Sequence, residues 1–199
     1  MSAVSHVIVG YDFSQSAHAA LQRAVAIVSR APTHVLHVIC VIDPRAPIPS
    51  VPSYDGVDLM YAARVQEVLA VHIQQELELS NVQSRVHFFV HARLGDKPAK
   101  EILELAEEVG ADLIVVGSHG LTGVERFLVG STSERIVREA GCSVEIARAK
   151  RYPDVELALT VEPEAGASGS GADHPYIPPH RYTYEDRRVN LRPPEWPLL

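Results

Sequence analysis

Leu113-Ile-Val-Val-Gly-Ser-His-Gly120 is the stretch that decides the fold of this 199-residue chain. Its four apolar residues predict a short buried strand, and the two glycines predict a loop directly after it. Nine residues further on, Gly130-Ser131-Thr132 opens a segment that predicts a helix over 131–140. A strand, a glycine-rich loop and a helix in this order are the layout of a phosphate-binding loop.

The chemistry of such a loop follows from its backbone. Gly117, Gly120 and Gly130 let the main chain approach an anion because they carry no Cβ. Free N–H groups at the start of the helix point toward that anion, and the helix dipole favours negative charge there. The hydroxyls of Ser131-Thr-Ser133 add further donors. Glycines also end strands and cap helices, so the same residues would equally serve the fold alone.

Strands and helices alternate on both sides of this stretch. Strands are predicted over 5–10, 34–42, 85–92, 113–116 and 144–148, and helices over 15–30, 57–79, 99–109 and 131–140. In the second helix, Met60, Ala63, Leu69, Ile73 and Leu77 are expected to face inward. The proline-rich segment 43–56 predicts a mobile loop.

This alternation predicts an α/β fold, with an open parallel sheet covered by helices on both faces. Ligands of such sheets bind beyond the carboxyl ends of the strands, at the point where the strand order reverses. The first strand ends in Gly10-Tyr-Asp12 and the fourth ends in the glycine loop. If these two strands are neighbours, both of their loops face one crevice.

The end of the chain differs in composition from the rest. Residues 1–150 hold every predicted element, whereas 151–199 hold 8 of the 14 prolines and the run Gly166-Ala-Ser-Gly-Ser-Gly-Ala172. We therefore expect a domain over 1–150 and a linker with a tail over 151–199. Apolar and aromatic residues gather over 174–199, which indicates either a solvated tail or docking on the core, on the dimer mate or on another protein partner.

Charge and composition exclude several classes of protein. The formal net charge is −7, with 17 acidic and 13 basic residues in 1–150 and 8 and 5 in 151–199. This acidic balance argues against nucleic-acid binding. No apolar run reaches the roughly 18 residues of a membrane span, and the start lacks a secretory signal. Cys40 and Cys142 are expected to be buried apolar residues, in a cytoplasmic protein.

At this point the chain resembles the universal stress protein family, over about residues 4–150. The resemblance implies a Rossmann-like fold with a five-stranded sheet in the order 3-2-1-4-5. Family members with the pattern Gly-x-x-Gly-x9-Gly-Ser/Thr resemble ATP binders, and another branch lacks the pattern and binds no nucleotide. The matching segments are Val7-Ile-Val-Gly-Tyr-Asp-Phe-Ser14, Gly95-Asp-Lys-Pro98, Ala111-Asp-Leu-Ile-Val-Val-Gly-Ser-His-Gly120, the spacer to Gly130-Ser131, and Val137-Arg-Glu-Ala-Gly-Cys-Ser-Val144.

The resemblance also implies a set of nucleotide contacts. Asp12 would lie near the ribose, where a carboxylate accepts from both hydroxyls, or it would cap the first helix. Val41 matches a position whose backbone meets adenine, or it is ordinary core. His119 would face a phosphate or solvent, and Arg126 would reach the terminal phosphate or stay a solvated loop charge. The positions that match phosphate contacts are Gly117, Gly120, Gly130, Ser131 and Thr132.

The implied ligand is ATP or another adenine nucleotide, with Mg²⁺. Asp12 is the nearest candidate carboxylate for Mg²⁺, and Asp43 and Asp96 would reach the ion through water. The sequence contains neither a P-loop lysine motif nor a nucleophile elbow, and no residue is assigned a catalytic role. We expect a stress-response protein that uses nucleotide occupancy as a switch, with slow hydrolysis at most. The first alternative is a scaffold that acts through its dimer surface and tail without a nucleotide, and a less favoured one is a slow ATPase.

Two further expectations concern metals and assembly. Among the ten histidines, His87 and His91 lie about 13 Å apart at about 3.3 Å per residue, so we expect no metal held by protein ligands alone. The resemblance implies a homodimer through the edge strand Val144–Arg148. Ser143 and Glu145 depart from the family's pattern there, and charge on an edge strand can block pairing.

Overall fold

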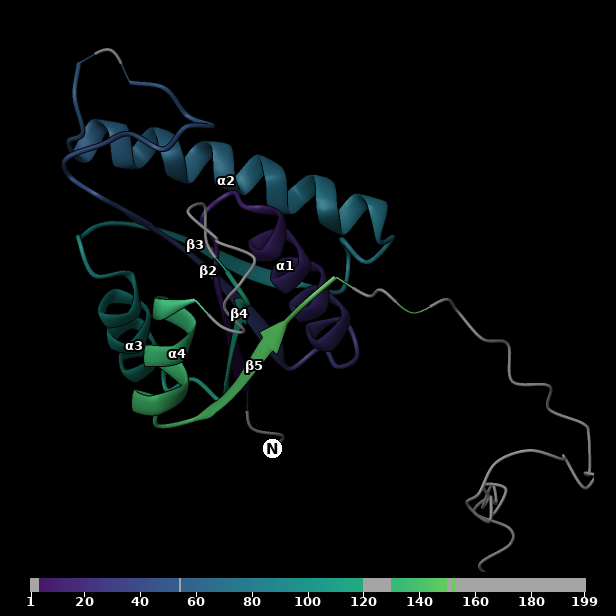
Figure 1. Cartoon of the computed structure of the whole chain (residues 1–199). Helices are drawn as coiled ribbons and strands as arrows, with labels where there is room; N and C mark the ends of the chain where they lie inside the picture. Colours follow the sequence, from purple (N-terminus) through teal and green to yellow (C-terminus); the bar gives the residue numbers. More distant parts are fainter. Residues whose placement is uncertain (1–3, 54, 120–129, 150–151, 153–199) are drawn as a thin grey trace, which may run out of the picture. The chain divides into compact units, whose positions relative to one another are not determined.

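The computed structural model describes residues 4–53, 55–119, 130–149 and 152 of the chain. Its described elements lie within Met1–Tyr152, the first of the two units into which the chain divides. One parallel sheet has the strand order β3-β2-β1-β4-β5 (Figure 1). This confirms the predicted fold class and order, and it places β1 beside β4. The strands are β1 (Ser5–Gly10), β2 (His34–Ile42), β3 (His87–Leu94), β4 (Leu113–Gly117) and β5 (Ser143–Ala147).

Four helices cover the two faces of this sheet. Helices α1 (Gln15–Val28) and α2 (Leu59–Leu79) pack on one face, and α3 (Pro98–Val109) and α4 (Ser131–Glu139) pack on the other (Figure 1). Alternate strand residues serve the two faces, so Val7 and Val9 join the first cluster while Ile8 joins the second. Burial on both faces explains why the strands read as nearly continuous apolar runs.

Local chemistry sets where the helices begin and end. The Ser14 hydroxyl accepts the N–H of Ala17 at 3.2 Å and starts α1, and the Asp58 carboxylate accepts the N–H of Tyr61 at 2.8 Å and starts α2. Pro98 occupies the first turn of α3, where its missing N–H costs nothing. Gly110 ends that helix in the left-handed conformation, at a φ of 64°.

The predicted phase of α2 is wrong at its start. Met60 is 77% exposed and Ala63 is also exposed, whereas Tyr61 and Val65 are buried. The helix begins at Leu59, because Asp58 caps it, and this start turns Tyr61 toward the core. Further along the helix, the inward positions Leu69, Ile73 and Leu77 are confirmed.

Other predicted boundaries shift by one or two residues. Helix α1 ends two residues before the predicted Arg30, because Ser29 already caps it. Strand β3 runs two residues later than predicted, since Arg85 still belongs to a turn in which its N–H bonds the Val82 carbonyl at 2.9 Å. Strand β5 begins at Ser143 and ends at Ala147, one residue before the predicted span.

The loop between β2 and α2 is fastened to the core by Tyr61. The Tyr61 hydroxyl accepts the N–H of Ile48 at 2.7 Å and donates to the carbonyl of Val51 at 2.6 Å. The side chains of Ile48 and Val51 are themselves buried. A buried hydroxyl and two apolar side chains thus anchor this part of 43–56 to the core. The mobility of the loop stays a prediction.

Replacing Tyr61 by Phe removes both hydrogen bonds and keeps the ring. The buried N–H of Ile48 and carbonyl of Val51 then lose their partner, so we expect a loss of about 1–3 kcal/mol in the free energy of unfolding. Urea denaturation measures this loss, and hydrogen exchange at Ile48 locates it. Tyr152→Phe, at an exposed tyrosine, is the matched control. Unchanged exchange at Ile48 in Tyr61→Phe would show that the hydroxyl does not hold the loop.

Candidate functional site

The loops that follow β1 and β4 come together at the carboxyl ends of the two central strands. Strand β1 pairs with β4 in parallel, from Val7 beside Leu113 to Val9 beside Val115. The segment after Gly10 therefore starts next to the segment after Gly117. This is the switch point of the sheet, where β1 lies between β2 and β4.

Asp12 belongs to a tight turn at this edge. Its Oδ1 accepts the N–H of Ser14 at 3.0 Å, and Ser14 in turn caps α1. Ser14 is therefore the N-cap residue of α1, and the Asp12 carboxylate fixes the position of Ser14. Between them Phe13 has a φ of 64°, a left-handed conformation that costs a bulky residue free energy. The rings of Tyr11 and His72 pack edge-on against Phe13, at centroid distances of 5.2 and 5.4 Å.

Gly117 is required by the packing of β4 on α1. A Cβ at this position would lie 2.6 Å from the carbonyl carbon of Ser16 and 2.7 Å from its oxygen. Real Cβ atoms do not approach backbone atoms so closely, so any larger residue would force the strand and the helix apart. The absent Cβ of Gly117 thus makes room for the main chain of α1, and this holds with or without an anion.

The two ends of the glycine loop are tied together. The Gly130 N–H donates to the carbonyl of Ser118 at 2.7 Å, and the Ser133 hydroxyl donates to the carbonyl of Gly117, also at 2.7 Å. Ser133 is buried. The expectation that its hydroxyl faces a ligand is therefore wrong, since this group fixes the start of α4 against the end of β4.

The first turn of α4 presents backbone donors without a side-chain cap. Gly130 precedes the helix at φ −71° and ψ 156°, and as a glycine it gives the first turn no side-chain cap. Ser131 is exposed and Thr132 is half-buried. These two predicted residues thus stand at a helix end that has the N–H groups and the dipole for an anion.

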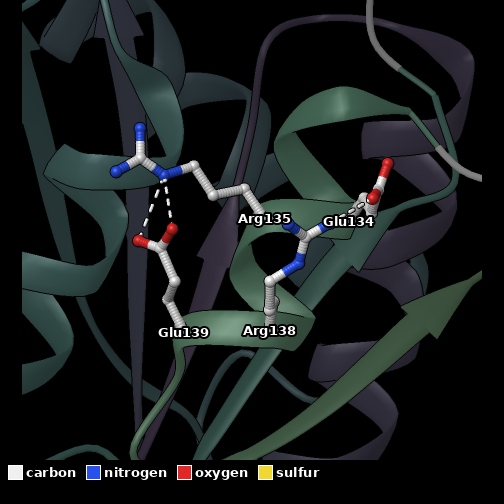
Figure 2. A network of polar contacts seen from close by, with 4 residues as sticks. All are labelled: Glu134, Arg135, Arg138 and Glu139. Atoms are coloured by element: carbon white, nitrogen blue, oxygen red, sulfur yellow. Dashed lines mark hydrogen bonds and ion pairs between the residues drawn. The ribbon is translucent and has the colours of Figure 1, made fainter.

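The charged side chains of α4 pair along the helix surface. Arg135 bonds Glu139 at 2.9 Å, and Arg138 pairs with Glu134 (Figure 2). Both pairs span one helical turn at exposed positions, where each contributes about 0.3–0.5 kcal/mol. Since Arg135 and Arg138 are engaged in this way, the donors that the described residues present at this helix end are its backbone N–H groups and hydroxyls.

The remaining predicted residues occupy different surroundings. The His119 ring contacts the Ser118 hydroxyl, with 3.0 Å between Nδ1 and Oγ, and its carbonyl accepts the hydroxyl of Ser16. Val41 is half-buried and packs with the cluster that holds Ile8. The structure therefore gives the Val41 side chain a role in the core and leaves its backbone role untested.

Asp43 is committed to a neighbour. Its carboxylate accepts two hydrogen bonds from the Arg45 side chain, at 2.9 and 2.7 Å, and another from the Arg45 N–H at 2.9 Å. These bonds from Arg45 lower the pKa of Asp43 to about 2. The predicted help of Asp43 at a water-bridged Mg²⁺ site would compete with this arginine.

Several predictions fall on parts of the chain that the structure leaves undescribed. Gly120 and Arg126 lie outside the described residues, and so does the proposed partner segment 174–199. Among the residues that are described, no group of three or more His, Cys, Asp or Glu side chains could hold a metal ion. No helix within 4–53, 55–119 or 130–149 is long and apolar enough to cross a membrane.

The cysteines occupy apolar surroundings. Cys40 is buried, and burial raises the pKa of its thiol to about 12. Cys142 is half-buried and packs against the α3 and α4 side of the core, where burial again raises its pKa. Neither thiol is therefore activated as a nucleophile.

Sequence reasoning missed the part that Ser16 plays at the site. Its hydroxyl donates to His119 across 103 positions of the chain, and its backbone lies where a Cβ of Gly117 would fall. Ser16 is two residues beyond the recognisable cap Ser14, and no local pattern marks a contact with a distant loop. Only the close pairing of β1 and β4 brings the two segments together.

Comparisons with known proteins agree with this geometry. The sequence pattern of the universal stress protein family matches residues 4–148. A relative from Staphylococcus epidermidis, which carries the universal stress protein name, is 32% identical over 165 residues, covering 77% of this chain and 90% of the relative.

Two solved structures share the fold. The hypothetical protein MJ0577 is 25% identical with a TM-score of 0.54, covering 76% of this chain and all of that one. A universal stress protein in complex with cAMP is 24% identical with a TM-score of 0.50, covering 73% and 98%. On the family match and the Staphylococcus relative together, the chain belongs to the universal stress protein family.

Proposed function

We propose that this chain is a cytoplasmic stress-response regulator in which a bound adenine nucleotide, ATP above all, acts as a switch and is hydrolysed slowly at most. The observation that carries the proposal is the start of α4, where Gly130 at the N-cap position gives the first-turn N–H groups no side-chain cap and where a hydrogen bond ties the helix to the end of β4. The phosphates would bind the first-turn N–H groups there, together with Ser131 and Thr132.

The arrangement around this helix end supports a preformed cradle. The bond from Gly130 to Ser118 and the bond from Ser133 to Gly117 fix the two ends of the loop before any ligand arrives. Preformed donors lose little freedom on binding, which favours affinity. One structure of the same fold holds cAMP, so this architecture accommodates an adenine nucleotide in that protein.

Asp12 would complete the site from the β1 side. The turn at Phe13 sets the carboxylate at the carboxyl edge of the sheet, and one of its oxygens bonds the Ser14 N–H. A carboxylate at this place would accept from the ribose hydroxyls, while the backbone of Val41 would meet the adenine. His119 and Arg126 are the further candidates near the phosphates.

Mg²⁺ would accompany the nucleotide. Bound with ATP, the ion would neutralise part of the phosphate charge, and one carboxylate beside the phosphates suffices to help hold it. Asp12 is the nearest candidate, because Asp43 is engaged by Arg45. The donor set at this edge therefore fits a nucleotide-borne Mg²⁺.

We also propose a homodimer through Val144–Arg148. In the sheet, β5 pairs with β4 on one side and forms the edge on the other. The charge at Glu145, which would hinder strand pairing, is met by Arg23 of α1 through two hydrogen bonds. Sedimentation equilibrium of the full chain tests this assembly, and a monomer mass at tens of micromolar would rule it out.

Gly130→Val tests the phosphate cradle. The backbone at Gly130 lies in the extended region, which any residue adopts, so the variant should fold. Its branched side chain would stand where the loop meets the helix, and we expect Mg-ATP affinity to fall at least tenfold, or about 1.4 kcal/mol. Isothermal titration of the full-length protein, freed of nucleotide carried through purification, measures the change.

Gly141→Ala is the matched control for this experiment. It changes a glycine beyond the other end of α4, where an added Cβ meets nothing within 4 Å, and it should bind as the parent does. Gly117→Ala would be uninformative, since its Cβ would collide with Ser16 and damage the fold. If the folded, nucleotide-free parent does not bind Mg-ATP, the proposal is contradicted and the scaffold function is favoured.

Asp12→Asn tests the ribose contact. Asparagine keeps an oxygen that can accept the Ser14 N–H, so the turn should persist while the charge is lost. Hydrogen bonds to a charged group contribute about 1.5–3 kcal/mol, so we expect roughly 10- to 100-fold weaker ATP binding. The preference for ATP over a deoxy analogue should shrink in parallel. An unchanged preference in the variant would remove Asp12 from the ribose site.

A further inference from the structure

Three histidines from three neighbouring strands are joined in series by hydrogen bonds. His6 of β1 faces His37 of β2, with 3.0 Å between Nδ1 and Nε2. The other ring nitrogen of His37, Nδ1, lies 3.2 Å from Nε2 of His91 on β3. We call His6, His37 and His91 the histidine ladder. Positions 6, 37 and 91 share the sheet face of α3 and α4, since Ile8 and Ile39 on the same faces of β1 and β2 pack there.

The middle ring of the ladder is shielded from water. His37 is only 5% exposed, and its ring stacks on Phe89 with a centroid distance of 5.2 Å and on His91 at 5.4 Å. Burial, followed by the neighbouring rings of His91 and His6, lowers the pKa of His37 to about 4. His37 is therefore neutral at pH 7, and both of its nitrogens are committed to the ladder.

The charged groups around the two ends differ. At the β1 end, the Asp112 carboxylate accepts the backbone N–H of His6 at 2.9 Å, and this bond together with one from Ser5 lowers the pKa of Asp112. At the β3 end, burial and Arg93 lower the pKa of His91, and Glu108 opposes them. His34 also faces Asp112. Negative charge thus dominates near His6, and a paired arginine and glutamate stand near His91.

Counting protons shows what the ladder can hold. Each N–H···N contact carries one proton, because one nitrogen must donate and the other accept. Three neutral rings bring three protons, which fill the two contacts and one outer nitrogen. A fourth proton fits on the other outer nitrogen with both contacts intact. A fifth would place two protons in one contact, and that contact would break.

We propose that the histidine ladder is a shared proton-binding site. It binds one added proton while both of its hydrogen bonds are kept, and one of these bonds breaks when a second proton binds. The side-chain link across β1, β2 and β3 therefore depends on pH. The first proton is held at the His6 end, where Asp112 supplies negative charge. Its arrival fixes the direction of both hydrogen bonds. His6 then donates to His37, and His37 donates through Nδ1 to His91.

This site is distinct from the proposed nucleotide crevice. His6 lies near the start of β1 and its neighbour Asp112 precedes β4, whereas Asp12 and Gly117 lie at the opposite ends of these strands. The exposed side of the ladder is marked by Phe89, which is 57% exposed, and by the exposed His87. Protons therefore have access to the ladder from the β3 edge of the sheet.

Nitrogen-15 spectroscopy of the imidazole rings in the full-length protein tests the proposal directly. Three independent rings with an ordinary pKa of about 6.5 would together hold nearly three added protons at pH 5. The ladder should hold close to one, with His37 as its Nδ1–H tautomer once that proton is bound. Independent titration of all three rings would overturn the proposal, and so would a His37 that carries its proton on Nε2 in the singly protonated ladder.

His37→Gln gives the second readout. Unfolded histidine takes up its proton near pH 6.5 and folded His37 only near pH 4, so the parent should lose stability as pH falls between these values. The urea midpoint of His37→Gln should fall less over this range, and His87→Gln, on the same strand and outside the ladder, should behave as the parent does. Equal pH dependence in all three proteins would also overturn the proposal. Should His37→Gln fail to fold, His6→Gln takes its place, and the proton count on the parent stands by itself.

Discussion

The arrangement at the carboxyl edge of the sheet depends on the contact between Gly117 and the backbone of Ser16. With no Cβ in the way, the end of β4 lies directly against the first turn of α1. That approach allows the Ser16 hydroxyl to reach the carbonyl of His119, and it brings the loop after β4 beside the turn that holds Asp12. The start of α4 follows, since Ser133 bonds the Gly117 carbonyl. The end of β4, the start of α1 and the start of α4 are thus held together around this contact.

The two described glycines of the motif, Gly117 and Gly130, are therefore present for different physical reasons. Gly117 is needed for the packing of two elements, and its presence would be explained even in a protein with no ligand. Gly130 has an ordinary extended backbone, so the fold does not demand a glycine at this position through its dihedral angles. A glycine that the backbone conformation does not require is a better indication that a ligand approaches the main chain than a glycine that packing requires. Gly130 therefore indicates an anion more strongly than Gly117 does.

The sequence predicted what local patterns encode. The strand order and the inward stripe Leu69, Ile73 and Leu77 were foreseeable from periodicity and the family resemblance. Met60 was misplaced because α2 offers apolar residues on more than one side, and only the cap at Asp58 and the docking of Tyr61 select the phase.

What could not be predicted are contacts between distant segments. The bond of Ser16 to His119 and the histidine ladder join residues that no spacing rule relates. Spacing along one strand relates His87 to His91, but it does not relate His91 to the other two histidines of the ladder. The relevant neighbours lie across strands, where the parallel register sets His37 opposite Phe89 and Ile39 opposite His91.

The tied ends of the glycine loop have a practical consequence for engineering. Ser118 and Gly130 are joined by a backbone hydrogen bond, and Ser133 holds the helix start to the end of β4. The closure of the loop is thus secured by residues outside 120–129. Lengthening a closed loop adds only about 0.6 kcal/mol of entropy per doubling. A reporter peptide inserted between 120 and 129 is therefore expected to leave the sheet and the start of α4 in place.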